Sequence, residues 1–105
     1  MSQSRDTMII RIFRVRVVSG REQDWQERVE RLSIPWLQSL PGLVAYYPGR
    51  PTPGSGERTF TMVMLFESMA AIQAAIGERW REPVLLGDEA TLVEAATVEH
   101  FEQFS

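Results

Sequence analysis

The only histidine of the chain, His100, lies near its end in the stretch TVEHFEQF, residues 97–104. Histidine is the side chain whose ordinary pKa lies near neutrality, so His100 is the first candidate for a general base. For a phenol or enol substrate, such a base would remove the proton and leave the ring electron-rich. The alternative is a strand histidine that bonds a backbone group or a neighbouring Glu in a structural role. Both interpretations stay open at this point.

Arg11 is the second candidate, because it shares one face of a predicted strand with Phe13 and two valines. If that face meets the helices, Arg11 is buried, and a buried guanidinium must be paired. Its partner could be a carboxylate or enolate oxygen of a ligand, which would make Arg11 an anion holder. The alternative partner is an acidic residue of the adjacent strand, Glu99 or Glu102.

Other site chemistries find little support in the sequence. One histidine and no cysteine cannot build the usual zinc or iron site, and the acidic residues of GDEA (87–90) are too few for an oxygen-only metal site. The glycine-rich PGSGE (53–57) lacks the Lys and the following helix of a phosphate-binding loop. We therefore expect neither a metal nor a cofactor.

The charge balance restricts the class of partner. The chain has 105 residues, with 11 basic and 14 acidic side chains and a formal net charge of −3. This balance argues against nucleic acid or an anionic membrane surface as the main partner. We find no apolar run of membrane-spanning length and no signal-peptide core, so a cytoplasmic protein is expected. The length predicts one domain over residues 8–105, after a polar, loose tail of residues 1–7.

Four strands and two helices must position these residues. Strands are predicted over 8–18, 43–47, 58–67 and 97–104, where β-branched and aromatic residues are frequent. Ser19 and Glu22 have the spacing of a capping box that would begin the first helix, and Pro35 should kink it near residues 33–34. Ser68 can cap the second helix, which should end at Gly77. Residues 78–96 are the least clear and allow a short third helix.

The order β-α-β-β-α-β predicts an α+β fold of the ferredoxin-like kind. Its four-stranded antiparallel sheet has the order 4-1-3-2, with both helices on one face. RNA-recognition modules share this order, and RTFTMVM (58–64) faintly resembles their strand-3 motif. However, Thr59 and Thr61 replace the glycines of that motif, and the net charge is negative.

The third predicted strand is apolar on both faces. Phe60, Met62, Met64 and Phe66 alternate with Thr61, Val63 and Leu65. Helices of this fold cover one side of the sheet only, so the other side needs a cover. We predict a homodimer that packs sheet against sheet. The alternative is an ordinary central strand with a few exposed apolar side chains.

Four short motifs in the right order resemble the antibiotic biosynthesis monooxygenase family of dimeric α/β-barrel proteins. They are RIF (11–13), LFES (65–68), MAAIQAAIGE (69–78) and VEHFE (98–102). The resemblance implies a dimeric α/β barrel and a small aromatic or polyketide-like ligand. The family includes cofactor-free oxygenases of polycyclic phenols and anthrones, heme-degrading oxygenases and isomerases.

The chain departs from two branches of this family at defined positions. The Asn, Trp and His that the heme-degrading branch carries are replaced here by Phe13, Ala75 and Leu85. Leu85 cannot ligate iron, which disfavours heme degradation. The chain has no Asn at all, and Phe66 stands where the oxygenase branch has Trp.

Two functions remain as hypotheses. In the first, the protein is a cofactor-independent monooxygenase or an isomerase, with His100 as base and Arg11 as anion holder. The predicted ligand-contacting residues are Phe13, Tyr47, Phe60, Met62, Phe66 and Trp80. In the second, the protein is a non-catalytic dimeric module that binds a small molecule or a partner, and His100 is structural.

Overall fold

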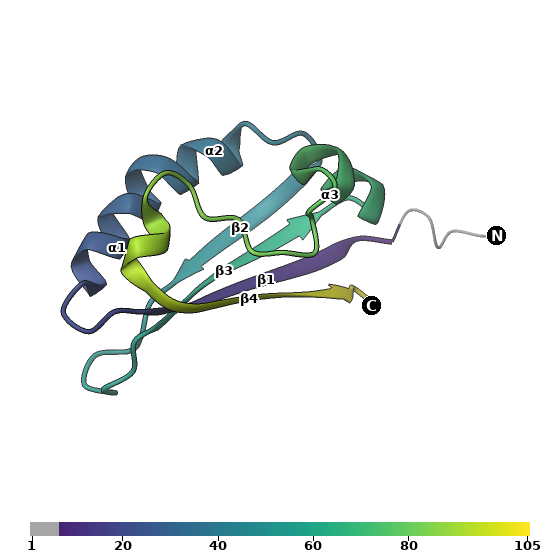
Figure 1. Cartoon of the computed structure of the whole chain (residues 1–105). Helices are drawn as coiled ribbons and strands as arrows, with labels where there is room; N and C mark the ends of the chain where they lie inside the picture. Colours follow the sequence, from purple (N-terminus) through teal and green to yellow (C-terminus); the bar gives the residue numbers. More distant parts are fainter. Residues whose placement is uncertain (1–6) are drawn as a thin grey trace.

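The computed structural model describes residues 7–105, and the elements follow one another as in Figure 1. Residues 1–6, which make up most of the predicted loose tail, lie outside the described residues. The elements are β1 (Ile9–Val17), α1 (Glu22–Arg28), η2 (Val29–Ser33), α2 (Ile34–Gln38), β2 (Leu43–Gly49), β3 (Thr59–Phe66), α3 (Met69–Ile76), η3 (Glu89–Leu92) and β4 (Val93–Glu102).

The four strands form one antiparallel sheet in the order β2-β3-β1-β4. This confirms the predicted ferredoxin-like topology, with β1 and β3 in the centre. In the register, Arg11 of β1 lies between Met64 of β3 and His100 of β4. The topology therefore brings together two candidate residues that are 89 positions apart in the sequence.

The first helical region is continuous but changes its winding before Pro35. A π-helical turn, η2, separates α1 from α2, and Pro35 lies in the first turn of α2. Proline has no N–H to donate to the preceding turn, and a wider π turn accommodates this loss without ending the helix. The predicted kink thus takes the form of a π turn.

The predicted capping box at Ser19 is wrong. Helix α1 begins at Glu22, and its N-cap residue Arg21 makes no side-chain capping bond. Instead, the Arg21 N–H donates to the carbonyl of Val18, and Gly20 adopts a φ of 87°. This tight turn uses the residues between β1 and α1, so Ser19 lies too early to cap the helix.

The second helix follows the prediction more closely. The Ser68 hydroxyl accepts a hydrogen bond from the Ala71 N–H at 3.1 Å, and α3 ends before Gly77 at φ 96°. The last strand begins earlier than predicted, at Val93 rather than residue 97. The unclear stretch before it contains one 3₁₀ turn, η3.

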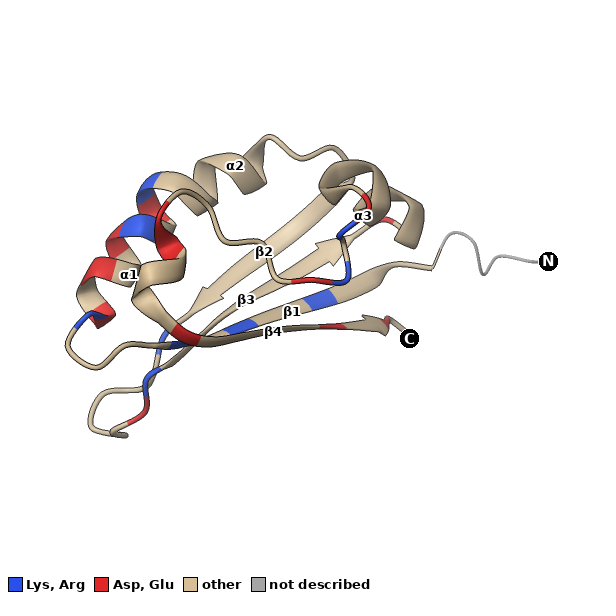
Figure 2. Ribbon diagram, viewed as in Figure 1, with Lys and Arg blue, Asp and Glu red and all other residues tan. Residues whose placement is uncertain are grey.

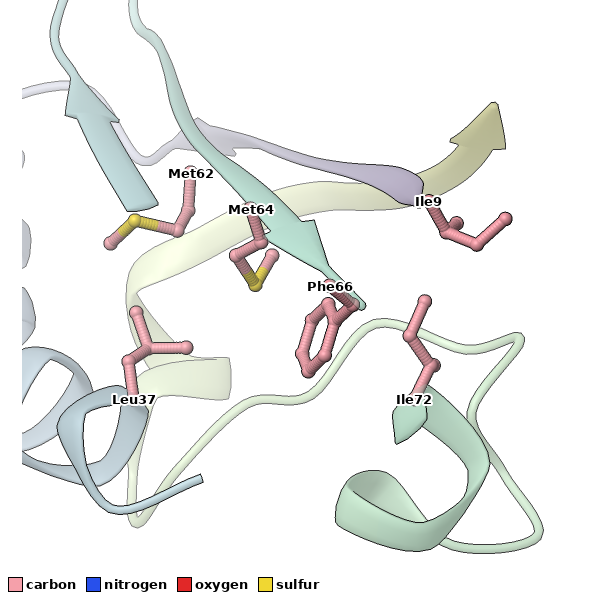
Figure 3. Close-up of a cluster of buried hydrophobic side chains, with 6 residues drawn as sticks. All are labelled: Ile9, Leu37, Met62, Met64, Phe66 and Ile72. Carbon is pink, nitrogen blue, oxygen red and sulfur yellow. The ribbon is translucent and has the colours of Figure 1, made fainter. Parts of the chain in front are cut away.

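The core lies between the sheet and the helices. Figure 3 shows one of its two clusters, in which Leu37 of α2 and Ile72 of α3 face Met64 and Phe66 of β3. The second cluster joins Trp25 of α1 to buried side chains of β1, β3 and η3, namely Val15, Val17, Phe60 and Leu92. Burial of such side chains stabilises the fold by about 1.5–3 kcal/mol each.

All helical segments cover the same face of the sheet, as Figure 1 shows. No element among residues 7–105 covers the other face, which we call the open face. Figure 2 shows that charged residues gather on α1 and η2, whereas β2 and β3 carry none. The centre of the open face is therefore apolar, with Ile12 paired to Val63 and Ile10 paired to Leu65.

Candidate functional site

A small apolar cavity lies between the sheet and the helices. Its volume is about 40 Å³, and its sheet wall consists of Phe13, Val15, Phe60, Met62 and Met64. This is room for about three water molecules, whereas an apolar cavity that binds benzene measures on the order of 150 Å³. An aromatic ligand therefore has to displace part of the wall.

A second hollow adjoins this cavity and opens to the surface. It has a volume of about 220 Å³ and shares Trp25, Val29, Phe60 and Thr61 with the cavity. Its outer rim carries polar side chains from α1, η2 and the end of β2, among them Arg50. The two hollows together lead from the surface toward the interior of the sheet–helix layer.

Arg11 is the charged residue at the cavity wall, and it is only 2% exposed. Its Nη1 donates to the Trp80 carbonyl at 2.5 Å and contacts His100 Nε2 at 2.9 Å. Its Nη2 donates to the Glu82 carbonyl at 3.1 Å. Burial lowers the pKa of Arg11 to about 10, so the guanidinium is still charged at neutral pH.

The partners of this buried cation are all neutral. The predicted alternative, a pair with Glu99 or Glu102, is wrong, because Glu99 pairs with Arg14 on the open face. Among residues 7–105, Arg11 has no carboxylate partner. An anion that reached the guanidinium would compensate a buried charge that no carboxylate of the described residues neutralises.

His100 lies next to Arg11 and does not line the cavity. Since arginine can only donate, His100 Nε2 must accept, and the ring proton is on Nδ1. Burial, then the charges of Arg11 and Arg81, lower the pKa of His100 below its ordinary value. The imidazole is thus kept neutral at pH 7, with its lone pair held by Arg11.

Trp80 contacts the site from outside the cavity. Its ring meets the His100 ring edge-on, with centroids 5.0 Å apart, and the guanidinium of Arg81 lies 4.4 Å over its centroid. The indole also packs against the first core cluster. Trp80 covers His100 and the Arg11 end of the site instead of lining the cavity.

The remaining predicted contact residues divide between three places. Phe13, Phe60 and Met62 line the cavity. Phe66 is fully buried in the first core cluster and does not reach the cavity. Tyr47 lies on the open face at 62% exposure, since it pairs with Val63, so it cannot contact a ligand in this cavity.

Sequence reasoning missed a second buried polar group, Glu89, which is 1% exposed. Its carboxylate accepts from the Leu86 N–H at 2.6 Å and from the Ser33 hydroxyl at 3.3 Å. Burial raises the pKa of Glu89. Ser33 itself lines the cavity from the π turn. A single Glu in a short, mixed stretch gives no periodic signal that would reveal its burial.

Residues 7–105 contain no group of three or more acidic, histidine or cysteine side chains placed to hold a metal ion, and none of their helices has the length and apolar character needed to span a bilayer.

The model of the antibiotic biosynthesis monooxygenase family matches residues 8–79. A search of curated proteins finds no match. A solved structure of a protein of unknown function from Nitrosomonas europaea is 20% identical, with a TM-score of 0.74 over 96% of this chain and 93% of that chain.

Two other solved structures have the same fold. A candidate antibiotic biosynthesis monooxygenase from Caulobacter crescentus is 15% identical, with a TM-score of 0.73 over 97% of this chain and 94% of that one. The heme-degrading protein of Mycobacterium tuberculosis is 22% identical, with a TM-score of 0.61 over 91% and 90% of the two chains. Identities this low show the fold alone. By its match to the family model, the chain belongs to the antibiotic biosynthesis monooxygenase family.

Proposed function

We propose that this protein is a homodimeric, cofactor-independent monooxygenase that acts on a small aromatic or polyketide-like molecule. The observation that carries the proposal is the buried Arg11 at the wall of an otherwise mostly apolar cavity. Apolar walls with few convergent polar groups are typical of small-molecule sites. Membership of the monooxygenase family supports the reaction class.

In this proposal Arg11 holds the oxygen of the deprotonated substrate. A cation beside a phenol or enol favours its charged form, so the substrate loses its proton more readily. His100 is the proposed proton acceptor, because its lowered pKa keeps it in the basic, neutral form. Its Nε2 lone pair accepts from Arg11, so the role requires Arg11 to turn its donors to the substrate.

The proposed reaction balances without a cofactor. The deprotonated substrate transfers electrons to O₂ and combines with it, and loss of water leaves a carbonyl, so that R₂CH₂ + O₂ gives R₂C=O + H₂O. The carbon is oxidised and O₂ is reduced. The protein contributes a mostly apolar cavity, the positive charge of Arg11 and a site for the proton.

Oxygen uptake with anthrone and naphthols as probes tests this function. We expect uptake that depends on the protein, and a loss of at least about tenfold in the Arg11→Gln variant, since one charge-assisted contact to the reacting oxygen is removed. Arg16→Gln, on the open face of the same strand, is the matched control and should keep the rate. Uptake that is equal in all three proteins would refute the role of Arg11.

The second candidate is a non-catalytic module that binds a small molecule. It is favoured by the position of His100, which lies outside the cavity wall with its lone pair occupied. Binding of anthrone or a naphthol, seen as a change in tryptophan fluorescence, without any protein-dependent oxygen uptake would select this function.

The homodimer is supported by the open face. Ile10, Ile12, Val63 and Leu65 lie at its centre, next to Tyr47 and Phe101, which are 62% and 48% exposed. A second copy that packs sheet against sheet would remove this apolar surface from water. Native mass spectrometry should show a species of twice 12.0 kDa.

A further inference from the structure

Residues 77–88 form a segment without regular secondary structure that passes over the sheet between α3 and η3 (Figure 1). We call this segment the strap. Val84 and Leu86 of the strap form part of the cavity wall. The backbone hydrogen bonds that its N–H groups make are local, from Gly77 to Gln73, Trp80 to Gly77 and Glu82 to Arg79. The strap is therefore the part of the wall that the sheet ladder and the helices do not hold.

Charged side chains hold the two ends of the strap. At one end, the Arg11 guanidinium donates to the carbonyls of Trp80 and Glu82. At the other end, the Glu89 carboxylate accepts from the Leu86 N–H, and Asp88 pairs with Arg28 of α1. Arg11 therefore does two things: it is hydrogen-bonded to the strap, and it forms part of the cavity wall.

We propose that the ligand of this cavity is an organic anion whose oxygen replaces the strap carbonyls of Trp80 and Glu82 on Arg11, so that ligand binding releases this end of the strap. The proposal rests on the proposed function, because it names the ligand class for the same cavity. The anion is a carboxylate, phenolate or enolate attached to an apolar, planar body.

Two physical reasons favour the exchange. A guanidinium bonded to a charged oxygen gains the attraction between opposite charges in addition to the hydrogen bond, and the contact can be bidentate. The carbonyls that Arg11 gives up belong to a segment at the surface, where Arg79, Arg81 and Glu82 are exposed and water can take over as donor. The cavity of about 40 Å³ also requires part of its wall to move before a ring can enter.

Limited trypsin digestion reads the state of the strap directly. The chain contains no Lys, so trypsin cuts only after Arg, and the strap carries Arg79 and Arg81. Cleavage of a folded segment requires local opening, and its rate follows the population of the open form. The bond after Arg58, outside the strap, is the internal reference, and mass spectrometry identifies each cut.

The wild-type experiment uses 2-naphthoate as the anion and 2-naphthamide as its neutral match. We expect 2-naphthoate to raise cleavage after Arg79 and Arg81 by about tenfold relative to cleavage after Arg58, which corresponds to about 1.4 kcal/mol. We expect 2-naphthamide to leave the ratio unchanged. No rise with 2-naphthoate up to its solubility limit, or the same rise with both compounds, overturns the proposal.

Substitutions test whether the change in strap cleavage depends on Arg11. Arg11→Met should cleave rapidly in the strap without any ligand, and 2-naphthoate should add nothing. Arg16→Met, on the open face of the same strand, should behave as the wild type. An unchanged strap in folded Arg11→Met overturns the proposal, and the wild-type experiment decides it if this variant does not fold. Because no turnover is measured, a negative oxygen-uptake result leaves this test intact, and the reverse also holds.

Discussion

Arginine residues have different environments on the two faces of the sheet. On the helix-covered face, Arg11 is buried and bonds two carbonyls and an imidazole, with no acidic partner among the described residues. On the open face of the same strand, Arg14 is exposed and pairs with Glu99. The covered face thus holds an uncompensated charge beside a cavity, whereas the open face pairs Arg14 with Glu99 and leaves its apolar residues half-buried or exposed.

The difference shows where function and association are expected. A buried charge without a counter-ion is unfavourable unless something compensates it, and an anionic ligand can do so. A broad apolar surface without a cover favours association with a second copy. Substitutions at neighbouring positions of one strand, one on each face of the sheet, can therefore be compared as matched pairs.

The largest difference between the faces should appear in strand β3. Phe66→Ala, on the covered face, should lower the free energy of unfolding by about 3–5 kcal/mol, because it leaves a cavity in a fully buried cluster. Val63→Ala, on the open face, should lower the free energy of unfolding of the monomer by less than about 1.5 kcal/mol, so both variants are measured at protein concentrations below the dissociation constant of the proposed dimer. Urea denaturation of both variants measures the two values. Similar losses would mean that the two faces are equally well packed.

A charge introduced at the centre of the open face should disrupt the proposed dimer. Ile12→Glu should weaken the proposed dimer by about a hundredfold, or about 2.8 kcal/mol, because each copy would bury an unpaired carboxylate. Ile12→Val keeps the apolar surface and is the control. Native mass spectrometry over a dilution series gives the dissociation constants. A wild-type protein that is monomeric at all concentrations removes the proposed interface.

His100 and its neighbour Glu99 should differ in how they affect the pH dependence of folding stability. The pKa of His100 in the fold lies below its ordinary value of 6.5, because burial and two cations disfavour the charged ring. The stability it contributes is therefore present above pH 6.5 and is lost as the pH falls through the lowered pKa. Wild type should lose stability relative to His100→Gln over this acidic range.

Glu99→Gln supplies the control for that comparison. Glu99 lies on the open face and pairs with Arg14, so its removal leaves His100 and Arg11 untouched. This variant should keep the stability loss that wild type shows below pH 6.5. Thermal unfolding of the three proteins between pH 5 and 8, about the range over which histidine changes charge, measures the effect. A His100→Gln curve parallel to that of wild type would contradict the lowered pKa.

The smallest effect should come from the exposed pair. Arg14→Met should change the free energy of unfolding by only about 0.2–1 kcal/mol, since both side chains of the Arg14–Glu99 pair are almost half exposed and solvent screens them. Urea denaturation at low and high salt measures this change. At protein concentrations where the chain is monomeric, a loss as large as that of a core substitution would contradict the weak, screened pair.

Several features of this protein were predictable from sequence, because they depend on local patterns. The alternation of apolar residues identified β3, Ser68 marked the start of α3, and the element order gave the sheet topology. The Ser19 cap failed, because a tight turn at Gly20 competes for the same residues. Arg11 lies opposite His100 because of the register between β1 and β4, and the predicted topology already placed these two strands side by side.

Only the tertiary structure decided the chemistry of the site. The sequence determined that Arg11 shares a face with Phe13, but its partners are carbonyls of residues 80 and 82, which no periodicity places near β1. The burial of Glu89 and the position of Tyr47 on the open face likewise depend on how the chain packs. Alternation along a strand fixes which residues share a face, whereas contacts between distant segments decide which face is covered and by what.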